Sequence, residues 1–188
     1  MLKKHIITLT GDPASGKGTV TEILQNELKY SVYRNGQYFR ELAAKNNMSV
    51  TEFNIYVKEH PEIDRDIERS AEIYAKEHDN LIIDARLGWY VVPESFKVYL
   101  TVDIDVAAKR AFCDTNECRK NTELFETQEE QKQDMIKRLE LENKRYFDVY
   151  GVKKDDMSNY DLVLDTTNLE PKEVCEIIKQ KYFKWLEK

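Results

Sequence analysis

The sequence predicts an α/β protein in which helices cover both faces of a parallel sheet. Short apolar runs of strand length alternate along the chain with longer segments of helical periodicity. The runs are rich in Ile, Val, Leu and Tyr, as is typical of buried parallel strands. A glycine-rich loop separates the first run from the first helical segment. We expect strands at His5–Thr10, Tyr30–Arg34, Leu81–Asp84, Lys97–Val102 and Asp161–Asp165.

The segments between the strands carry apolar residues at helical spacing. In the first of them, Val20, Leu24 and Leu28 fall on one face. Pro61 suits the first turn of a helix, and Gly151 suits the residue just after one. We expect helices at Gly16–Leu28, from about Gln37, at Val50–Lys58, Pro61–Glu77, Val106–Phe112 and Glu129–Tyr150, and from Pro171.

Two segments exceed what a simple strand–helix–strand alternation needs. Residues 36–78 place several helices between the second and third strands, and residues 113–130 are polar. Both are typical of additions that cover a ligand, and the second is typical of a moving lid. Without a repeat or a Pro/Gly/Ser linker, we expect residues 1–188 to form a single domain.

Charge and composition narrow the class of partner. The chain has 188 residues, with 29 basic and 35 acidic ones, and a formal net charge of −6. An acidic balance argues against nucleic acid as the main partner, but a few arginines suffice to bind a phosphorylated small molecule. We also expect a monomer, because the sequence has no long apolar surface run.

The sequence contains no candidate for a membrane span or an export signal. No apolar run approaches the roughly 20 residues that cross a bilayer. The opening Met1–Lys4 leads directly into the first expected strand, so we expect no signal peptide and a cytoplasmic protein. Three cysteines, Cys113, Cys118 and Cys175, are too few for a disulfide framework. Cys113 and Cys118 have no further cysteine or histidine nearby, so we do not expect them to bind zinc.

The glycine-rich loop has the spacing of a phosphate-binding loop. It reads Gly-Asp-Pro-Ala-Ser-Gly-Lys-Gly-Thr over residues 11–19, between the first strand and the first helix. Backbone N–H groups and the helix dipole favour phosphate there, and Lys17 is expected at the β- and γ-phosphates. The candidate ATP-binding residues of the loop are Gly11, Asp12, Ala14, Ser15, Gly16, Lys17, Gly18 and Thr19.

One position departs from the general motif. Gly18 follows Lys17, so the hydroxyl that usually contacts Mg²⁺ is displaced to Thr19. This Gly-Lys-Gly-Thr form resembles nucleoside monophosphate kinases such as adenylate and cytidylate kinases. The resemblance implies a Mg²⁺ ion held mainly by nucleotide phosphates and water.

A phosphate acceptor has to be inferred from the arginines. Arg40 lies on the helix after the second strand, and Arg86 follows the third strand. Both positions are at or beyond the carboxyl ends of strands, where open α/β sheets bind their ligands. If these arginines bind no ligand, the alternative is that Arg40 is a solvated helix residue and that Arg86 belongs to a surface ion pair.

Further segments resemble the short cytidylate kinase family typical of archaea and some bacteria. The resemblance covers nearly the whole chain apart from residues 113–130. It is carried by Met48-Ser49, Glu52-Phe53, His60–Arg65, Arg86–Trp89, Lys144–Phe147, Tyr150-Gly151 and Tyr160–Thr167.

The resemblance implies the three-layer αβα fold of P-loop nucleoside monophosphate kinases. Its five-stranded parallel sheet would have the order 2-3-1-4-5, with a helical acceptor-binding insert at about 36–78 and a lid at about 113–130. Arg40 and Arg86 would hold the acceptor phosphate, and Gly36 would be a further acceptor-binding residue. Asp64 and Arg65 would read the base, although a charged run of this kind is more often a solvated helix face.

The long helix and the strand ends supply the remaining candidates. Arg138, Glu142 and Arg145 share one helix face. By resemblance the two arginines would contact phosphates and Glu142 the ribose, the alternative being an ordinary ion-paired surface. Asp84 resembles a carboxylate that orders water around Mg²⁺, the alternative being a cap. Resemblance also implies that Arg110 and Thr167 lie near the ATP base, although the usual companion of Arg110 is missing around Cys113.

Together these features predict a kinase that transfers the γ-phosphate of ATP to CMP or dCMP, with Mg²⁺ as cofactor. We expect in-line transfer without a covalent intermediate, aided by charge neutralisation. The candidate catalytic residues are Lys17, Arg86, Arg110, Arg138 and Arg145. Two alternatives stay open, namely a kinase for AMP, UMP or a small metabolite, and a nucleotide-binding regulatory protein without turnover.

Overall fold

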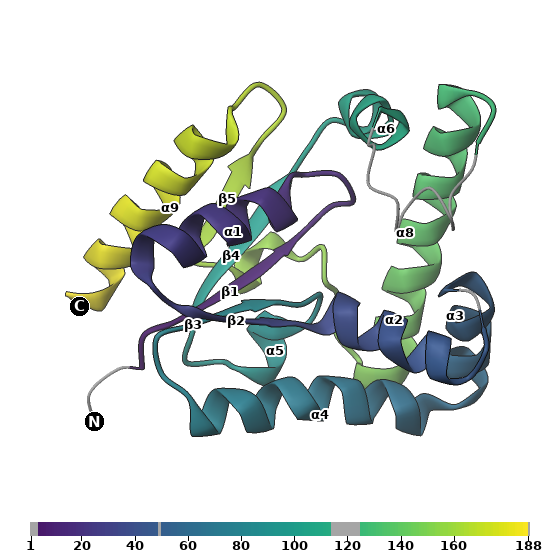
Figure 1. The fold of residues 1–188 in the computed structure, drawn as a ribbon, viewed down its shortest axis with the longest axis horizontal. Coiled ribbons are helices and arrows are strands. Elements are labelled where there is room, and N and C mark those ends of the chain that lie inside the picture. Colours follow the sequence, from purple (N-terminus) through teal and green to yellow (C-terminus); the bar gives the residue numbers. More distant parts are fainter. Residues whose placement is uncertain (1–3, 49, 114–124, 188) are drawn as a thin grey trace.

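A parallel sheet of five strands forms the centre of the molecule (Figure 1). The structure is a computed structural model, and it describes residues 4–48, 50–113 and 125–187. The strand order is β2-β3-β1-β4-β5, and every neighbouring pair is parallel, which confirms the predicted order. The strands are β1 (Ile6–Gly11), β2 (Ser31–Arg34), β3 (Leu81–Asp84), β4 (Phe96–Thr101) and β5 (Leu162–Asp165).

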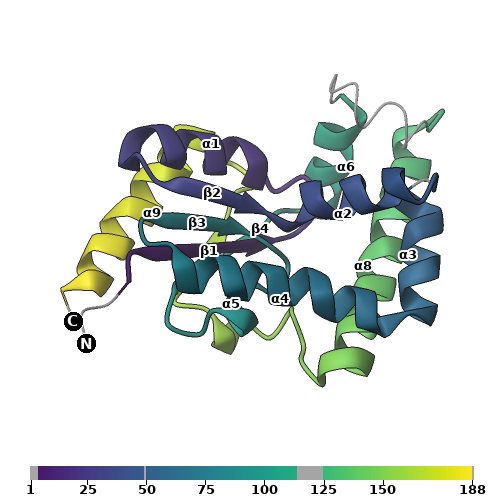
Figure 2. The same cartoon turned by 60° about the horizontal axis from the view of Figure 1, so that its bottom comes forward.

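Helices cover both faces of this sheet, as the alternation of elements predicts. Figures 1 and 2 show α1 and α9 on one face and α4 and α5 on the other, with α2, α3, α6 and α8 beyond one end of the strands. The helices are α1 (Lys17–Leu28), α2 (Asn35–Lys45), α3 (Val50–Glu59), α4 (Pro61–Glu77), α5 (Gly88–Val91), α6 (Ile104–Phe112), α8 (Gln128–Tyr150), the 3₁₀ turn η1 (Met157–Asn159) and α9 (Pro171–Leu186).

The predicted elements are all present, with ends that differ by one or two residues. The short α5 and η1 were not predicted, because a single turn has too few residues to show a periodicity. Asp103 caps α6, and Gly151 ends α8 in the left-handed conformation. Of the expected lid, residues 114–124 lie outside the described residues, and 128–130 form the first turn of α8.

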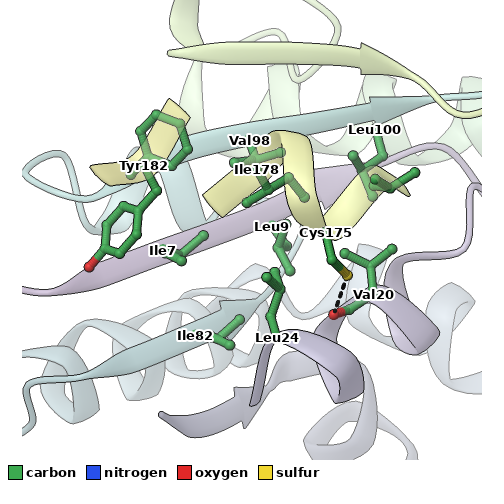
Figure 3. Close-up of a cluster of buried hydrophobic side chains, with 12 residues drawn as sticks. Ile7, Leu9, Val20, Leu24, Ile82, Val98, Leu100, Cys175, Ile178 and Tyr182 are labelled. Atoms are coloured by element: carbon green, nitrogen blue, oxygen red, sulfur yellow. Dashed lines mark hydrogen bonds between the residues drawn. The ribbon is translucent and has the colours of Figure 1, made fainter. Parts of the chain in front are cut away.

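The larger core lies between the sheet and the helices α1 and α9. Figure 3 shows Ile7 and Leu9 of β1 packed towards Leu24 of α1 and Ile178 of α9. The Sγ atom of Cys175 also lies 3.6 Å from the carbonyl of Val20, which joins the two helices. These buried contacts hold the start of α1, and with it the glycine-rich loop, over the sheet.

One apolar residue of the C-terminal helix α9 lies outside the core. The side chain of Phe183 is 49% exposed. The neighbouring Tyr182 is fully buried instead and packs edge-on against Tyr30. Burial leaves the hydroxyl of Tyr182 satisfied, because it pairs with the hydroxyl of Tyr30 at 3.1 Å.

A smaller core lies between the sheet and α4. Ile6 of β1 and Ile83 of β3 point to this face and contact Ala75. Beyond it, Ala43 of α2 and Phe53 of α3 form a separate apolar cluster inside the predicted acceptor insert. Within the insert, α2 and α3 therefore pack together beyond one end of the sheet, while α4 covers a face of the sheet. Within the described residues, no helix is both long and apolar enough to cross a membrane.

Candidate active site

The glycine-rich loop connects β1 to α1 in a tightly wound conformation. Gly16 has φ 86°, which glycine adopts without strain, and Ala14 has φ 56°, which is costly for a residue with a side chain. A Cβ at Gly11 would lie 2.5 Å from the carbonyl oxygen of Leu100, so no side chain fits there. Strained backbone of this kind is found at ligand-binding loops.

Contacts from the neighbouring strands hold the loop in place. The backbone N–H of Asp12 donates to the carbonyl of Leu100 at 2.9 Å, and the Tyr99 hydroxyl donates to Asp12 Oδ1 at 2.6 Å. The Thr166 hydroxyl donates to the carbonyl of Ser15 at 3.0 Å. The buried Tyr99 thus helps to hold the loop as well as packing in the core.

Lys17 pairs with the acid at the end of β3. Its Nζ lies 2.8 Å from Asp84 Oδ1, and both side chains are largely buried. Burial acts to raise the pKa of Asp84, but the ammonium of Lys17, with Arg86 and Arg34 nearby, holds it below its ordinary value. The two predicted residues are therefore brought together at the carboxyl ends of β1 and β3.

Arg86 bridges the loop and the long helix. Its Nη1 donates to the carbonyl of Gly11 at 2.5 Å, and its Nε lies 2.8 Å from Glu142 Oε1 of α8. The side chain is still 28% exposed, so N–H groups remain for a ligand. This geometry fixes a guanidinium beside the glycine-rich loop, as expected for a residue that holds phosphate.

Glu142 is the centre of an ion-pair cluster. Besides Arg86, its carboxylate faces Lys154, with 3.4 Å between Nζ and Oε2. Burial acts to raise the pKa of Glu142, but Arg86, Lys154 and Arg145 together lower it to about 2. Nearby, Arg145 Nε lies 3.4 Å from Asp64 Oδ2. We call Asp64, Arg86, Glu142, Arg145 and Lys154 the ion-pair cluster.

The cluster joins three parts of the chain and has an excess of positive charge. Asp64 comes from α4, Arg86 from the loop after β3, and Glu142 and Arg145 from α8. Three cations face two carboxylates, which leaves one positive charge without an anionic counterpart inside the cluster. A buried site of this kind favours an entering anion such as a phosphate.

Glu68 lies beside the cluster and differs from its carboxylates in protonation. One turn after Asp64 on α4, it is 5% exposed, and its Oε2 accepts from Asn35 Nδ2 at 3.1 Å. Burial and the charge of Asp64 raise its pKa to about 8, although Arg145 acts against this. Glu68 is therefore predominantly a neutral acid at pH 7 and leaves the positive excess of the cluster intact.

Because the folded protein binds the Glu68 proton more tightly than the unfolded chain, stability is expected to fall as the pH rises from about 4.5 to 8. Glu68→Gln removes this dependence, so the variant should exceed the wild type in unfolding free energy by on the order of a few kcal/mol at pH 8.5 and match it near pH 4.5. The groups facing Glu68 are Tyr33, Asn35, Asp64, Glu142, Arg145, Tyr146 and Tyr150.

Urea unfolding at several pH values measures this effect. Glu77→Gln, at an exposed position of the same helix, is the matched control and should keep the pH dependence of the wild type. A constant difference between Glu68→Gln and the wild type from pH 5 to 8.5 would show that Glu68 is ionised throughout.

Three of the predicted acceptor-binding arginines do not join the cluster in this structure. Arg40 is exposed on α2, near Gly36, where an added Cβ would lie 3.7 Å from Arg40 Nη1. Arg65 is exposed and lines a pocket between α4, α5 and the end of α8, which Asp64 does not line. Arg138 is 47% exposed and lies 3.8 Å from Asp134 on its own helix.

On the side of the predicted site that would face the ATP base, Arg110 contacts the loop after β5. Arg110 Nη2 donates to the carbonyls of Thr166 and Thr167 at 2.9 and 3.2 Å. The loop after β5 is thereby joined to α6, next to the glycine-rich loop that Thr166 contacts. Gly18 and Thr19 are exposed at the start of α1.

Sequence reasoning missed Lys154, Glu68 and Asn35. Lys154 is fully buried, although the sequence places it in a charged stretch that indicates a surface loop. Glu68 occurs in a highly charged helix, where only the helical phase that puts it with Ile67 and Ala71 marks it as inward-facing. That phase was the one available signal.

Comparison with known proteins identifies the family. A family model described as an AAA domain matches residues 7–134. A cytidylate kinase of Thermoplasma volcanium is 36% identical over 178 residues, which are 92% of this chain and 88% of that protein. A cytidylate kinase of Archaeoglobus fulgidus is 34% identical over 177 residues, 92% of this chain and 91% of that one. The chain belongs to the cytidylate kinase family.

Not every relative of this cytidylate kinase family member has the same name. An S-adenosylmethionine-dependent nucleotide dehydratase of Lacinutrix mariniflava is 32% identical over 182 residues, which are 96% of this chain but 36% of that longer protein. Among solved structures, shikimate kinase from Bacteroides thetaiotaomicron superimposes with a TM-score of 0.62 at 18% identity, covering 98% of this chain and 99% of that chain. The structural likeness shows the P-loop kinase fold.

Proposed function

We propose that this protein transfers the γ-phosphate of ATP to CMP or dCMP, giving ADP and CDP or dCDP. Membership of the cytidylate kinase family supports the reaction. The observation in the structure that carries it is Arg86, which is held between the carbonyl of Gly11 and the carboxylate of Glu142. A fixed cation that lies beside the donor loop and belongs to the positively charged ion-pair cluster suits the transfer of a phosphoryl group between two anions.

The residues of the glycine-rich loop fit a nucleoside triphosphate. Gly11 leaves no room for a side chain, Ser15 Oγ is buried without a protein partner among the described residues, and Lys17 starts α1. Backbone N–H groups there would hold the phosphates. Bound Mg²⁺ would neutralise phosphate charge, with Asp84 acting on a water of its shell. The proposed ATP-binding residues are Gly11, Asp12, Ala14, Ser15, Gly16, Lys17, Gly18, Thr19, Arg110 and Thr167.

The acceptor would enter between the helical insert and α8. Arg86 and Arg145 would hold its phosphate, because the ion-pair cluster contains one more cation than carboxylates. Gly36 and Arg40 on α2 would complete that site, and Asp64 would face the base. Arg65 and Arg138 are exposed, so their proposed contacts require the insert and α8 to move together on binding.

Transfer would proceed by positioning and charge neutralisation. Lys17 would follow the moving phosphoryl group, and Arg86, Arg110, Arg138 and Arg145 would balance the charge that spreads over its oxygens. Closure of residues 113–130 would exclude water, which otherwise receives the phosphoryl group. We propose a single catalytic domain over residues 1–188 that works as a cytoplasmic monomer on nucleotides rather than on nucleic acid.

Release of ADP from MgATP, measured with and without CMP, tests the proposal. Strong stimulation by CMP or dCMP is expected, with CDP or dCDP formed in equal amount. Tight ATP binding without acceptor-dependent ADP release would instead favour a regulatory nucleotide-binding protein. Stimulation by AMP or UMP alone would retain phosphoryl transfer and overturn the acceptor.

A further inference from the structure

A lysine outside the predicted site lies fully buried behind the glycine-rich loop. Lys154 follows α8, and its side chain has no exposed surface. Burial lowers the pKa of its ammonium, although Glu142 acts to raise it. Lysine is seldom enclosed in this way unless it is paired. The contacts of Lys154 therefore decide what its enclosed ammonium does.

The ammonium of Lys154 connects to the loop through two ion pairs. Lys154 Nζ lies 3.4 Å from Glu142 Oε2, and the other oxygen of Glu142 lies 2.8 Å from Arg86 Nε. Arg86 in turn donates to the carbonyl of Gly11. Each oxygen of Glu142 thus faces one cation, which fixes the plane of the carboxylate and the direction of the Arg86 guanidinium.

The backbone of Lys154 connects to the same loop by a second route. Its carbonyl accepts from the Tyr160 hydroxyl at 2.7 Å. The ring of Tyr160 packs edge-on against Tyr99, with 4.9 Å between centroids, and the Tyr99 hydroxyl donates to Asp12. The residue is therefore anchored at both ends to consecutive residues of the glycine-rich loop, Gly11 and Asp12.

We propose that Lys154 is a positioning residue for phosphoryl transfer, which holds Glu142 so that Arg86 stays directed at the phosphates on the glycine-rich loop. The enclosed ammonium has no path to a substrate, so Lys154 acts through Glu142. This inference rests on the proposed function and adds to it a residue that lies outside the glycine-rich loop and the acceptor-binding helices.

Stability alone does not account for the arrangement. Burying an ammonium and a carboxylate costs free energy that their attraction rarely exceeds, and apolar replacements of buried pairs are often neutral or stabilising. The pair does, however, fix the orientation of a guanidinium whose remaining N–H groups are accessible. Orientation of a charged group to within a fraction of an ångström matters for transfer rates rather than for folding.

Steady-state kinetics of Lys154→Met and Lys154→Arg test the proposal. Methionine keeps the length and apolar stem of lysine but not its charge, so kcat is expected to fall about 10- to 100-fold. Arginine keeps the charge and should recover part of that loss. Lys153→Met, at the exposed neighbouring position, is the matched control and should retain wild-type kcat and KM.

A double-mutant cycle with Glu142→Gln separates positioning from a structural role. If Lys154 acts through Glu142, Lys154→Met should lower kcat by less than about threefold in the Glu142→Gln background. The double variant removes both charges of the Lys154–Glu142 pair, so neither is left buried without the other, and it serves if Lys154→Met alone folds poorly. An undiminished effect of Lys154→Met in that background, or wild-type kinetics of Lys154→Met, would overturn the proposal.

Calorimetric binding of MgATP to the same variants keeps this inference distinct from the proposed function. A wild type that binds MgATP but transfers phosphate to no acceptor would contradict the function. The Lys154 proposal would then be decided by affinity, which should fall about tenfold in Lys154→Met and stay unchanged in Lys153→Met. Equal affinity of those two variants would contradict it.

Discussion

Lys17→Ala is expected to lower kcat for phosphoryl transfer by on the order of a thousandfold, with a correctly folded protein. Lys17 begins α1 at the point where the loop presents its N–H groups, and its ammonium already lies beside Asp84. No other lysine of the described residues pairs with that carboxylate. Coupled ADP production with MgATP and CMP measures the loss, and circular dichroism checks the fold.

Two further variants separate chemistry from stability in this experiment. Lys17→Ala leaves Asp84 buried without its main cation, which is destabilising, so Lys17→Ala/Asp84→Asn supplies a version without that charge. Lys184→Ala, at an exposed position of α9, should behave as the wild type. Near-normal transfer by either Lys17 variant would refute the role of Lys17 in the reaction.

Arg86→Ala is expected to reduce kcat/KM for the acceptor by about 100- to 1,000-fold. The guanidinium contacts the carbonyl of Gly11 on one side and Glu142 on the other. An alanine side chain makes neither contact. Arg86→Lys should recover little, because an ammonium lacks the planar fork that spans both partners. Initial rates at varied CMP and fixed MgATP give the split between kcat and KM.

The same substitution has a cost in stability that needs its own control. Without Arg86, the buried Glu142 keeps only Lys154 and Arg145, and losing one partner of a buried pair typically costs about 3–5 kcal/mol. Arg86→Ala/Glu142→Gln/Lys154→Met, which leaves neither Glu142 nor the enclosed Lys154 as an unpaired charge, should regain much of this loss in urea unfolding while remaining impaired in transfer. Recovery of transfer along with stability would mean that Arg86 acts only as a structural residue.

The sheet and the glycine-rich loop could be predicted because their signals are local. Buried parallel strands such as Leu81–Asp84 are short continuous apolar runs, and the loop has a fixed spacing between its glycines and Lys17. The strand order came from the family resemblance rather than from the runs themselves. Within the site, the pairing of Lys17 with Asp84 follows once the carboxyl ends of β1 and β3 are adjacent.

The rest of the site depends on contacts between residues far apart in sequence. Nothing local distinguishes Lys154 from the exposed Lys153, and its burial follows from the packing of the segment after α8 against Tyr160 and Glu142. The hydroxyl of Tyr99 reaches Asp12 because β4 pairs with β1 beside the loop. The sequence alone does not show that pairing. Partners of this kind are decided by tertiary packing, which single-sequence patterns do not contain.

The roles of individual arginines stay predictions for a related reason. Arg138 and Arg145 have equivalent sequence signals, yet Arg145 is 13% exposed beside Asp64 and Arg138 is 47% exposed. Helical spacing assigns both to one face, but it does not say how far along the helix the neighbouring insert reaches. The expected lid at 113–130 lies mostly outside the described residues, so its contribution is likewise a prediction.

The central claim is that CMP or dCMP receives the phosphoryl group. Its most direct test is ADP production from MgATP against equal concentrations of CMP, dCMP, UMP, AMP and shikimate, with the phosphorylated product identified by chromatography. We expect CMP or dCMP to support the highest kcat/KM and to yield CDP or dCDP. A higher kcat/KM with AMP, UMP or shikimate, or no acceptor-dependent ADP with any of them, would contradict it.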